Sequence, residues 1–325
     1  MMRNFLRALA LALAGALAAT TASAADWPSK PIRFVVPFPP GGTTDLIARL
    51  LQDKLQRSLG QTVIVENKAG AQGVIGTAAV ANAEPDGYSY VLAFDVYATA
   101  PATTPKLPFD PKADLVPVAP LGRSPQVLVV SKDVKAAGLR ELWQAQIAKS
   151  GELFFGTSAT GSYAHLAMAE LARQSGMPAT HVPYKGGSPM IMATIAQEIA
   201  LGIGSVGLTS PQIKEGGRLR PIAVMSEQRI PGIDAPTLAE QGFPPVVADS
   251  WWALLAPAKT PAPILATMQR EIYQALEDPA VLQKYAEQGV IPPEHVSSQA
   301  YHDFINGEID RWSEVAKAQG IAAGG

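Results

Sequence analysis

The chain has 325 residues, with 26 Lys and Arg against 28 Asp and Glu, so its formal net charge at pH 7 is −2. This balance, with no basic cluster, argues against a nucleic acid as a partner. The absence of cysteine excludes disulfide bonds and thiolate metal sites.

The first residues have the features of an export signal. Arg3 and Arg7 form a basic start, residues 8–19 are a short apolar run, and Ala22-Ser23-Ala24 is a small-residue cleavage site. The run is shorter than the roughly 20 apolar residues that span a bilayer. We therefore expect cleavage after Ala24, a periplasmic location, and a mature chain long enough for two domains.

A strand followed by a glycine-rich loop and a helix opens the mature chain. Residues 32–36 are branched and apolar, Pro39-Pro40-Gly41-Gly42 follows them, and leucines then recur at helical spacing until Gly60. Thr43 or Thr44 is a candidate cap for this helix. Because such a loop lies at the carboxyl edge of the strands, beside free helix N–H groups, it is a candidate anion site. A tight turn without a ligand would explain the same residues.

Two further strands continue this pattern at residues 62–66 and 88–94, and a second glycine loop, 67–76, opens a helix between them. The order βαβαβ predicts a parallel sheet with helices on its faces. Gly70, Gly73 and Gly76 do not have the spacing of a dinucleotide-binding loop, so we expect no NAD and no other cofactor. Residues 97–120 are rich in proline and are predicted to be irregular.

A second βα series begins near residue 126 and resembles the first. It contains another small-residue loop, 156–162, that opens a helix extending to about residue 174. The remaining predicted elements are a helix at 139–149, strands at 126–131, 153–155, 180–183, 199–205, 219–225 and 250–255, and helices at 263–276, 279–288 and 298–318. The helical tail is expected to pack back on the first domain. The predicted division is a signal at 1–24, domain 1 at 25–123 and 249–325, and domain 2 at 124–248.

The chain resembles the Bug-type extracytoplasmic substrate-binding proteins of tripartite tricarboxylate transporters along its whole mature length. The segments that carry this resemblance are VVPFPPGGTTDLIAR (35–49), VENKAGAQGVIG (65–76), EPDGYSYVLAF (84–94), LPFDPKADLVPVAPLG (107–122), GTSATGSYAHLAMAEL (156–171), HVPYKGGSP (181–189), LRPIAVMSEQR (219–229), APTLAEQGFP (235–244) and SWWALLAPAKTP (250–261). The resemblance implies an α/β, two-domain fold of periplasmic-binding-protein type. Each domain would be a βα-layered, mostly parallel sheet, with a ligand cleft between the domains.

The resemblance also implies a function and a site. Members of the family bind small carboxylates without chemistry and deliver them to a membrane permease, and we expect this chain to act as a monomer. Backbone groups of the two loops would hold the carboxylate, partly through water. The residues implied are Phe38, Pro40, Gly41, Gly42, Thr43 and Asp45 in the first loop, and Thr157, Ser158, Gly161, Ser162 and His165 in the second.

Several of these residues have a structural interpretation beside the functional one. Asp45 in the first turn stabilises its helix by about 0.3–1 kcal/mol, and that role is favoured. His165 is favoured as a neutral histidine that holds its loop, with direct ligand contact as the alternative. Tyr184 lines the cleft or closes a turn, and Trp251 is strand core or pocket wall. Together with Ser205, these two residues are candidates for the distal part of the pocket.

Two departures from the family pattern bear on the distal end of the ligand. Residues 197–200 read Gln-Glu-Ile-Ala where many members carry Gly-x-Val-Asp, and Asp95 ends the third strand where neutral residues are common. We expect Asp95 to face the cleft, where it would favour a ligand hydroxyl, amide or ammonium over a second carboxylate. The alternative is a turn acid that caps Tyr97 or is solvated beyond the strand.

Three functions are compatible with these residues. The first is a binding protein that serves a transporter, and the second is a binding protein that presents its ligand to a signalling receptor. The third is an exported hydrolase that uses His165 with Ser158 or Asp45, although Ser158 lacks the G-x-S-x-G spacing of a nucleophile elbow. His181, His295 and His302 lack metal-ligand spacing, so no metal is expected.

Overall fold

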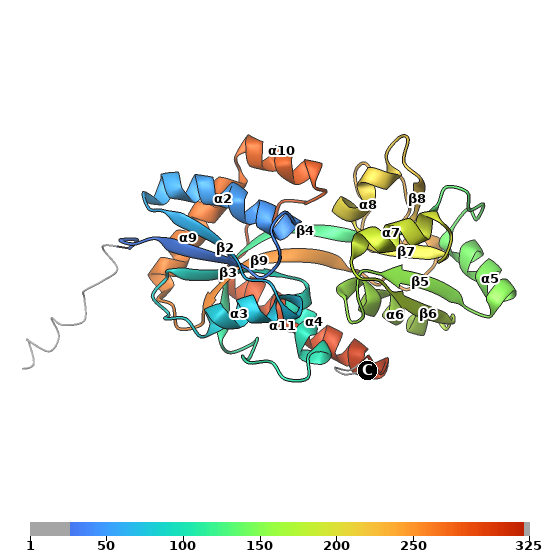
Figure 1. Cartoon of the computed structure of the whole chain (residues 1–325), viewed down its shortest axis with the longest axis horizontal. Coiled ribbons are helices and arrows are strands. Elements are labelled where there is room, and N and C mark those ends of the chain that lie inside the picture. The colour runs from blue at the N-terminus through green and yellow to red at the C-terminus, as the bar shows by residue number, and fades with distance from the viewer. Residues whose placement is uncertain (1–26, 322–325) are drawn as a thin grey trace, which may run out of the picture.

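The computed structural model describes residues 27–321 and consists of two lobes joined by long strands (Figure 1). The predicted signal segment and its cleavage site after Ala24 lie outside the described residues. No helix within residues 27–321 combines the length and apolar character needed to cross a membrane.

The first lobe is built on three parallel strands. β1 lies between β2 and β3, as the predicted βαβαβ order requires. Its elements are β1 (Ile32–Val36), α2 (Thr43–Leu59), β2 (Val63–Asn67), a 3₁₀ turn η1 (Ala71–Gly73), α3 (Val74–Ala81), β3 (Ser89–Phe94) and α4 (Val96–Thr103).

The second lobe repeats this arrangement around β5, which pairs in parallel with β6 and β7. Its elements are α5 (Leu139–Ser150), β5 (Leu153–Thr157), α6 (Tyr163–Ser175), β6 (Ala179–Pro183), α7 (Gly187–Ile195), β7 (Leu201–Ser205), α8 (Val206–Ile213), β8 (Leu219–Val224) and a 3₁₀ turn η2 (Ala239–Gln241). Helices α7 and α8 were not predicted, because the Gly, Ser and Pro residues in them are typical of loops.

Two strands, β4 (Leu115–Ser131) and β9 (Asp249–Pro257), run between the lobes (Figure 1). They pair with each other, and every antiparallel pairing among the described strands involves one of them. The strand order is β2-β1-β3-β9-β4-β7-β5-β6, with β8 also paired to β4. The lobes are therefore connected through a continuous mixed sheet.

The prediction that residues 97–120 are irregular was wrong. α4 and the first half of β4 occupy this segment. β4 contains Pro117 and Pro120, which cannot donate a backbone hydrogen bond. The pairing with β9 shifts register at both prolines, and these irregularities let the strand continue.

The C-terminal helices return to the first lobe, as predicted. They are α9 (Ala262–Leu276), α10 (Pro279–Glu287) and α11 (Ser298–Ala318). α9 packs on α2, whereas α11 packs on α4 and also reaches α6 of the second lobe. Helix α11 therefore contacts both lobes.

Helix α2 is held by an apolar face and ends where the sequence predicts. Ile47, Leu51 and Leu55 are fully buried against β1, and each contributes about 1.5–3 kcal/mol through burial. Gly60 adopts the left-handed conformation, with φ of 67°, that ends the helix. The predicted threonine cap was wrong, because Gly42 is the N-cap and Thr43 is already helical.

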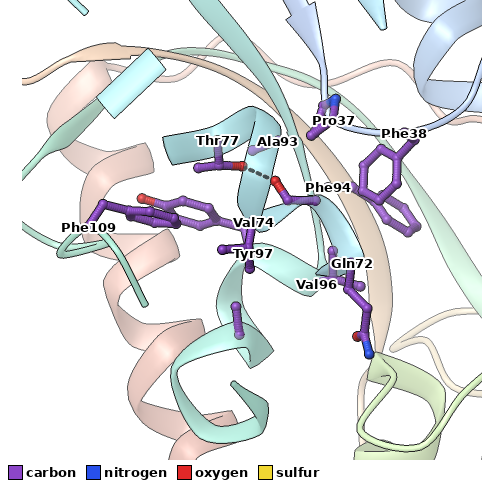
Figure 2. A pocket seen from close by; sticks show the side chains of 12 residues that line it. Pro37, Phe38, Gln72, Val74, Thr77, Ala93, Phe94, Val96, Tyr97 and Phe109 are labelled. Carbon is purple, nitrogen blue, oxygen red and sulfur yellow. Dashed lines mark hydrogen bonds between the residues drawn. The ribbon is translucent and has the colours of Figure 1, made fainter. Parts of the chain in front are cut away.

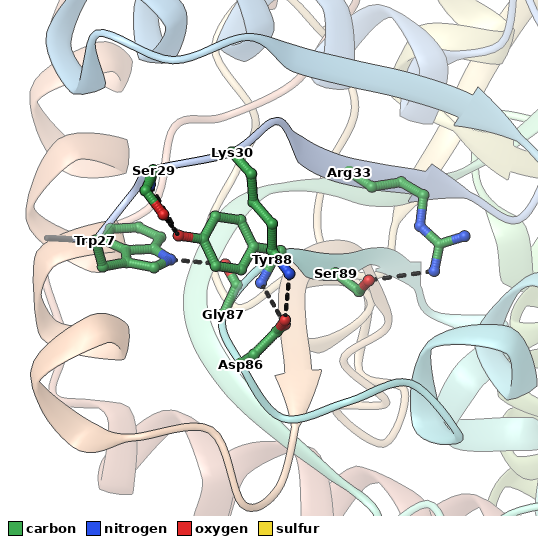
Figure 3. A network of polar contacts seen from close by, with 8 residues as sticks. All are labelled: Trp27, Ser29, Lys30, Arg33, Asp86, Gly87, Tyr88 and Ser89. Carbon is green, nitrogen blue, oxygen red and sulfur yellow. Dashed lines mark hydrogen bonds and ion pairs between the residues drawn. The ribbon is translucent and has the colours of Figure 1, made fainter. Parts of the chain in front are cut away.

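The start of the described chain is fixed to the N-terminal end of β3 (Figure 3). The Trp27 indole donates to the Gly87 carbonyl (3.2 Å), and the Ser29 N–H donates to the Tyr88 hydroxyl (2.9 Å). Lys30 pairs with Asp86 at 2.8 Å and lies over the Tyr88 ring. These contacts order the chain soon after the predicted cleavage site.

Candidate functional site

The first loop presents backbone groups at the start of α2. Pro40, Gly41 and Gly42 are exposed, and no side chain of the described residues caps the first turn of the helix. A Cβ atom built on Gly41 or Gly42 would meet nothing within 4 Å. Figure 1 shows this end of α2 facing the second lobe. The first turn therefore offers free N–H donors and the positive end of the helix dipole at an open surface.

The side chain of Asp45 fixes this loop through hydrogen bonds. The residue is 4% exposed, and its carboxylate accepts from the Gly41 N–H (3.1 Å), Arg49 Nε (3.0 Å) and Asn67 Nδ2 (2.9 Å). Burial alone would raise the pKa of Asp45, but the hydrogen bonds from Arg49, Gly41 and Asn67 outweigh burial and lower that pKa. These contacts give Asp45 a structural role in the loop, whereas its predicted stabilisation of the helix and its contact with a ligand stay predictions.

Aromatic side chains pack against one another beside the first loop. Phe38 contacts Phe94 edge to face, with centroids 6.0 Å apart, and Phe94 stacks on Trp252 at 5.0 Å. The Trp252 indole donates to Thr44 Oγ1 (2.9 Å). Figure 2 shows the small pocket beside Phe38, whose volume of about 10 Å³ suits a single water molecule.

Gln72 is a candidate that the sequence reasoning missed. Ala71 and Gln72 have φ of 46° and 53°, a left-handed conformation that costs non-glycine residues about 1–3 kcal/mol each. The Gln72 side chain is exposed, and its amide points away from the apolar pocket in Figure 2. Backbone strain of this kind is common at binding sites. The flanking Gly70 and Gly73 mark a loop that can take unusual backbone conformations, and they were the sequence signal that could have drawn attention to Gln72.

The second loop is held by a buried network of hydroxyl and imidazole groups. Thr157 Oγ1 donates to the Ala159 carbonyl (3.0 Å), accepts from Ser162 Oγ (3.1 Å) and lies 2.7 Å from His181 Nε2. Ser162 is the N-cap of α6 and accepts from the His165 N–H (3.3 Å). Thr157 and Ser162 therefore act together to fix the loop.

His165 is a neutral histidine within this network. Its Nδ1 accepts from the Gly161 N–H (3.0 Å), and its ring stacks on His181 with centroids 3.6 Å apart. Burial, followed by the nearby His181, lowers the pKa of His165 to about 3, and burial lowers the pKa of His181 to about 4. The predicted loop-holding role of His165 is confirmed by the bond to Gly161, and direct ligand contact stays a prediction.

The second loop also contacts the first lobe and the segment that contains Tyr184. Gly161 has φ of 71°, and a Cβ atom there would lie 2.6 Å from Thr103 Cγ2 at the end of α4. The Ser158 carbonyl accepts from the Gly186 N–H (2.9 Å), and the Thr157 carbonyl accepts from the Tyr184 N–H (3.1 Å). The structure therefore brings Tyr184 close to this loop.

Ser205 and Trp251 lie at other positions on the connecting sheet. Ser205 is the N-cap of α8, at the carboxyl end of β7, and is paired in register with Gln126 of β4. Trp251 is 2% exposed and packs against Phe304 of α11, whereas its neighbour Trp252 bonds Thr44 in α2. Since successive strand residues face opposite ways, Trp251 points away from the first loop.

Asp95 lies at the carboxyl end of β3, as predicted, but the residue is only 2% exposed. It accepts from Ser250 Oγ, which in turn accepts from Gln126 Nε2 (2.7 Å). Burial raises the pKa of Asp95 to about 7, against the opposing effect of the Ser250 hydrogen bond. The group thus links β3 to both connecting strands, and its role in specificity stays a prediction.

Among residues 27–321, no group of three or more His, Asp or Glu side chains is placed to hold a metal ion. Within the described residues, the side chains of Ser158 and His165 form no hydrogen bond with each other. The nucleophile and base of the hydrolase hypothesis are therefore not paired.

The chain also matches known proteins along almost its whole length. The family model described as "Tripartite tricarboxylate transporter family receptor" matches residues 47–321. The chain belongs to this family. BugT of Bordetella pertussis is 37% identical over 322 residues, which cover 98% of each chain. The resemblance stated from the motifs is thereby confirmed.

Solved structures of similar proteins share the fold. Rpa4515 of R. palustris with adipate has a TM-score of 0.79 and 33% identity, covering 92% of this chain and 100% of that one. MatC of Rhodopseudomonas palustris with bound malate has a TM-score of 0.75 and 29% identity, covering 89% and 99%. The predicted two-domain α/β fold is confirmed. Proteins of this family are periplasmic solute-binding receptors rather than enzymes.

Proposed function

We propose that this protein captures a small organic acid between its two lobes and delivers it to the permease of a tripartite tricarboxylate transporter. The observation that carries the proposal is the exposed, uncapped start of α2 at Gly41 and Gly42. Backbone N–H groups at a helix start are suited to a carboxylate. Two relatives with the same fold hold adipate and malate, both of which are carboxylates.

The second loop completes the site in this proposal. It lies against Thr103 of the first lobe and is kept rigid by Thr157, Ser162 and His165. Neither loop contains Arg or Lys, so one carboxylate would rest on backbone donors rather than on a full countercharge. Gln72 and Tyr184 are the nearby side chains that we assign to the rest of the ligand.

We place the domain boundaries at residues 123/124 and 248/249, within β4 and at the start of β9. Arg123 and Asp249 form an ion pair beside both boundaries. The mature protein would start at Ala25, act as a monomer in the periplasm, and close its lobes around the ligand by bending at these strands.

A panel of mono- and dicarboxylates, aromatic acids and amino acids, measured by thermal shift and then by calorimetry, tests the proposal. We expect saturable binding of at least one acid, with adipate and malate as the first probes, and no turnover of that acid. Turnover, or the absence of binding across all acids in a protein that unfolds cooperatively, would contradict it.

A further inference from the structure

A large cavity lies on the side of the connecting strands that α11 covers. Its volume is about 650 Å³, and both lobes line it. The first lobe contributes residues between 291 and 311, and the second lobe contributes Tyr163, Glu227 and Val247. None of its lining residues belongs to segments 38–45 or 157–162, so it is separate from the proposed carboxylate site.

One wall of this cavity is aromatic. Trp251 meets Phe304 edge to face at 6.0 Å, and Phe304 stacks on Tyr301 at 5.4 Å. Phe304 is 42% exposed, so part of its ring is open to a ligand. Aromatic faces of this kind attract cations through their quadrupoles.

Two polar atoms in the cavity wall are buried without a partner among the described residues. They are the indole Nε1 of Trp251, whose residue is 2% exposed, and Oδ1 of Asp249. A buried donor or acceptor without a partner is costly, so a small side-chain shift that opened either atom to the cavity would be favoured by a ligand atom that bonds it. The indole requires an acceptor and the carboxylate requires a donor.

The charges in the cavity favour a cation. Four carboxylates line it, from Glu227, Asp249, Glu294 and Glu308, against two guanidinium groups. Both guanidinium groups are engaged. Arg123 pairs with Asp249 Oδ2, and Arg311 pairs with Glu308 and donates to the Val247 carbonyl (2.8 Å). Glu227 and Glu294 form no ion pair within residues 27–321, so their negative charge is available.

We propose that this cavity is a second binding site, which takes an organic cation with an apolar body and a hydroxyl group. The ammonium of the ligand donates to Asp249 Oδ1 and is attracted by Glu227 and Glu294. Its apolar body packs on Phe304 and Tyr301, and its hydroxyl oxygen accepts from Trp251 Nε1. An organic anion is repelled by the same carboxylates, so the two sites of the protein differ in the sign of charge they select.

Calorimetry with tyramine as the probe tests this site on the mature, full-length protein. Tyramine carries an ammonium, a ring and a hydroxyl, whereas 4-ethylphenol is a matched probe without the ammonium. We expect one tyramine per chain, affinity that falls with added salt, and binding of 4-ethylphenol that is weaker by about tenfold or more.

Substitutions of the lining residues test whether tyramine binds in this cavity. Glu227→Gln with Glu294→Gln should weaken tyramine about tenfold, because two unpaired charges are removed. Phe304→Ala should weaken the binding of both probes, because it removes an aromatic ring from the cavity wall. Glu84→Gln, a change at another exposed and unpaired glutamate, should have no effect. Each variant alters an exposed side chain, and cooperative thermal unfolding verifies its fold.

Three results would overturn the proposal. They are no tyramine binding at millimolar concentration, equal affinity for 4-ethylphenol, and wild-type tyramine affinity in the folded double glutamate variant. All of them are independent of whether an organic acid binds at the first site.

Discussion

Replacing Gly42 by Val tests carboxylate recognition with little effect on folding. The Gly42 backbone has φ of −83° and ψ of 171°, an extended conformation that any residue adopts, and a Cβ atom there meets nothing within 4 Å. The substitution alters only the N-cap of α2. We therefore expect the free energy of unfolding to fall by no more than about 1 kcal/mol.

The expected effect on binding is larger. The valine side chain would occupy the space in front of the first-turn N–H groups, where we place the ligand carboxylate. A hydrogen bond to a charged group contributes about 1.5–3 kcal/mol, so losing one should weaken binding by about 10- to 150-fold at 25 °C. Loss of two such bonds would remove measurable binding of a micromolar ligand.

Calorimetry of the acid found by the panel, with wild type and Gly42→Val, measures this difference. Gly307→Val on α11 is the matched control, because a Cβ atom at Gly307 also meets nothing within 4 Å. Gly161→Val is a poorer test, since φ of 71° and the contact with Thr103 would strain the fold. Unchanged affinity in a folded Gly42→Val protein would refute the placement of the carboxylate.

Four further predictions concern the buried acid, in stability and in binding, the closure of the lobes and the N-terminus. Because burial raises the folded-state pKa of Asp95 to about 7, the native protein binds this proton more tightly than the unfolded chain, so stability should fall as pH rises from about 4 to 7. In denaturant titrations, Asp95→Asn should reduce this pH-dependent fall in the free energy of unfolding by at most about 4 kcal/mol. A pH profile parallel to that of the wild type would contradict the raised pKa of Asp95. The same variant should weaken a cationic or donor-bearing ligand of the carboxylate site by about tenfold in calorimetry, and equal affinities would show that Asp95 has no part in specificity. Small-angle scattering should give a smaller radius of gyration at saturating acid, whereas an unchanged profile would indicate a rigid pocket. Intact-mass analysis of periplasmic protein should find Ala25 first, and a retained Met1 would disprove the cleavage.

Local patterns predicted most of the fold elements because their signals lie within each segment. The strand at 32–36 and the helix at 298–318 have the predicted bounds, since apolar periodicity and capping residues mark them. The prediction of a threonine N-cap was wrong because a threonine hydroxyl can bond a distant residue instead of a helix N–H group. Thr44 instead accepts from Trp252, a residue more than two hundred positions away in the sequence.

Local sequence patterns predicted only part of the candidate site. Both glycine loops were visible in the sequence, but the left-handed conformation of Gln72 was not, because glutamine has no local preference for it. Trp251 and Trp252 could not be assigned to opposite faces until the neighbours of β9 were known.

The sequence by itself determined the family, the βα order and the two loops that open helices, because each depends on residues that are close together in the chain. The tertiary structure alone decided three other features: that β4 continues through its prolines, that His165 and His181 stack as neutral rings, and that Asp95 is buried against Ser250. Each of these depends on partners from distant segments. Hydrogen bonding, burial and pKa are set by what surrounds a group in space.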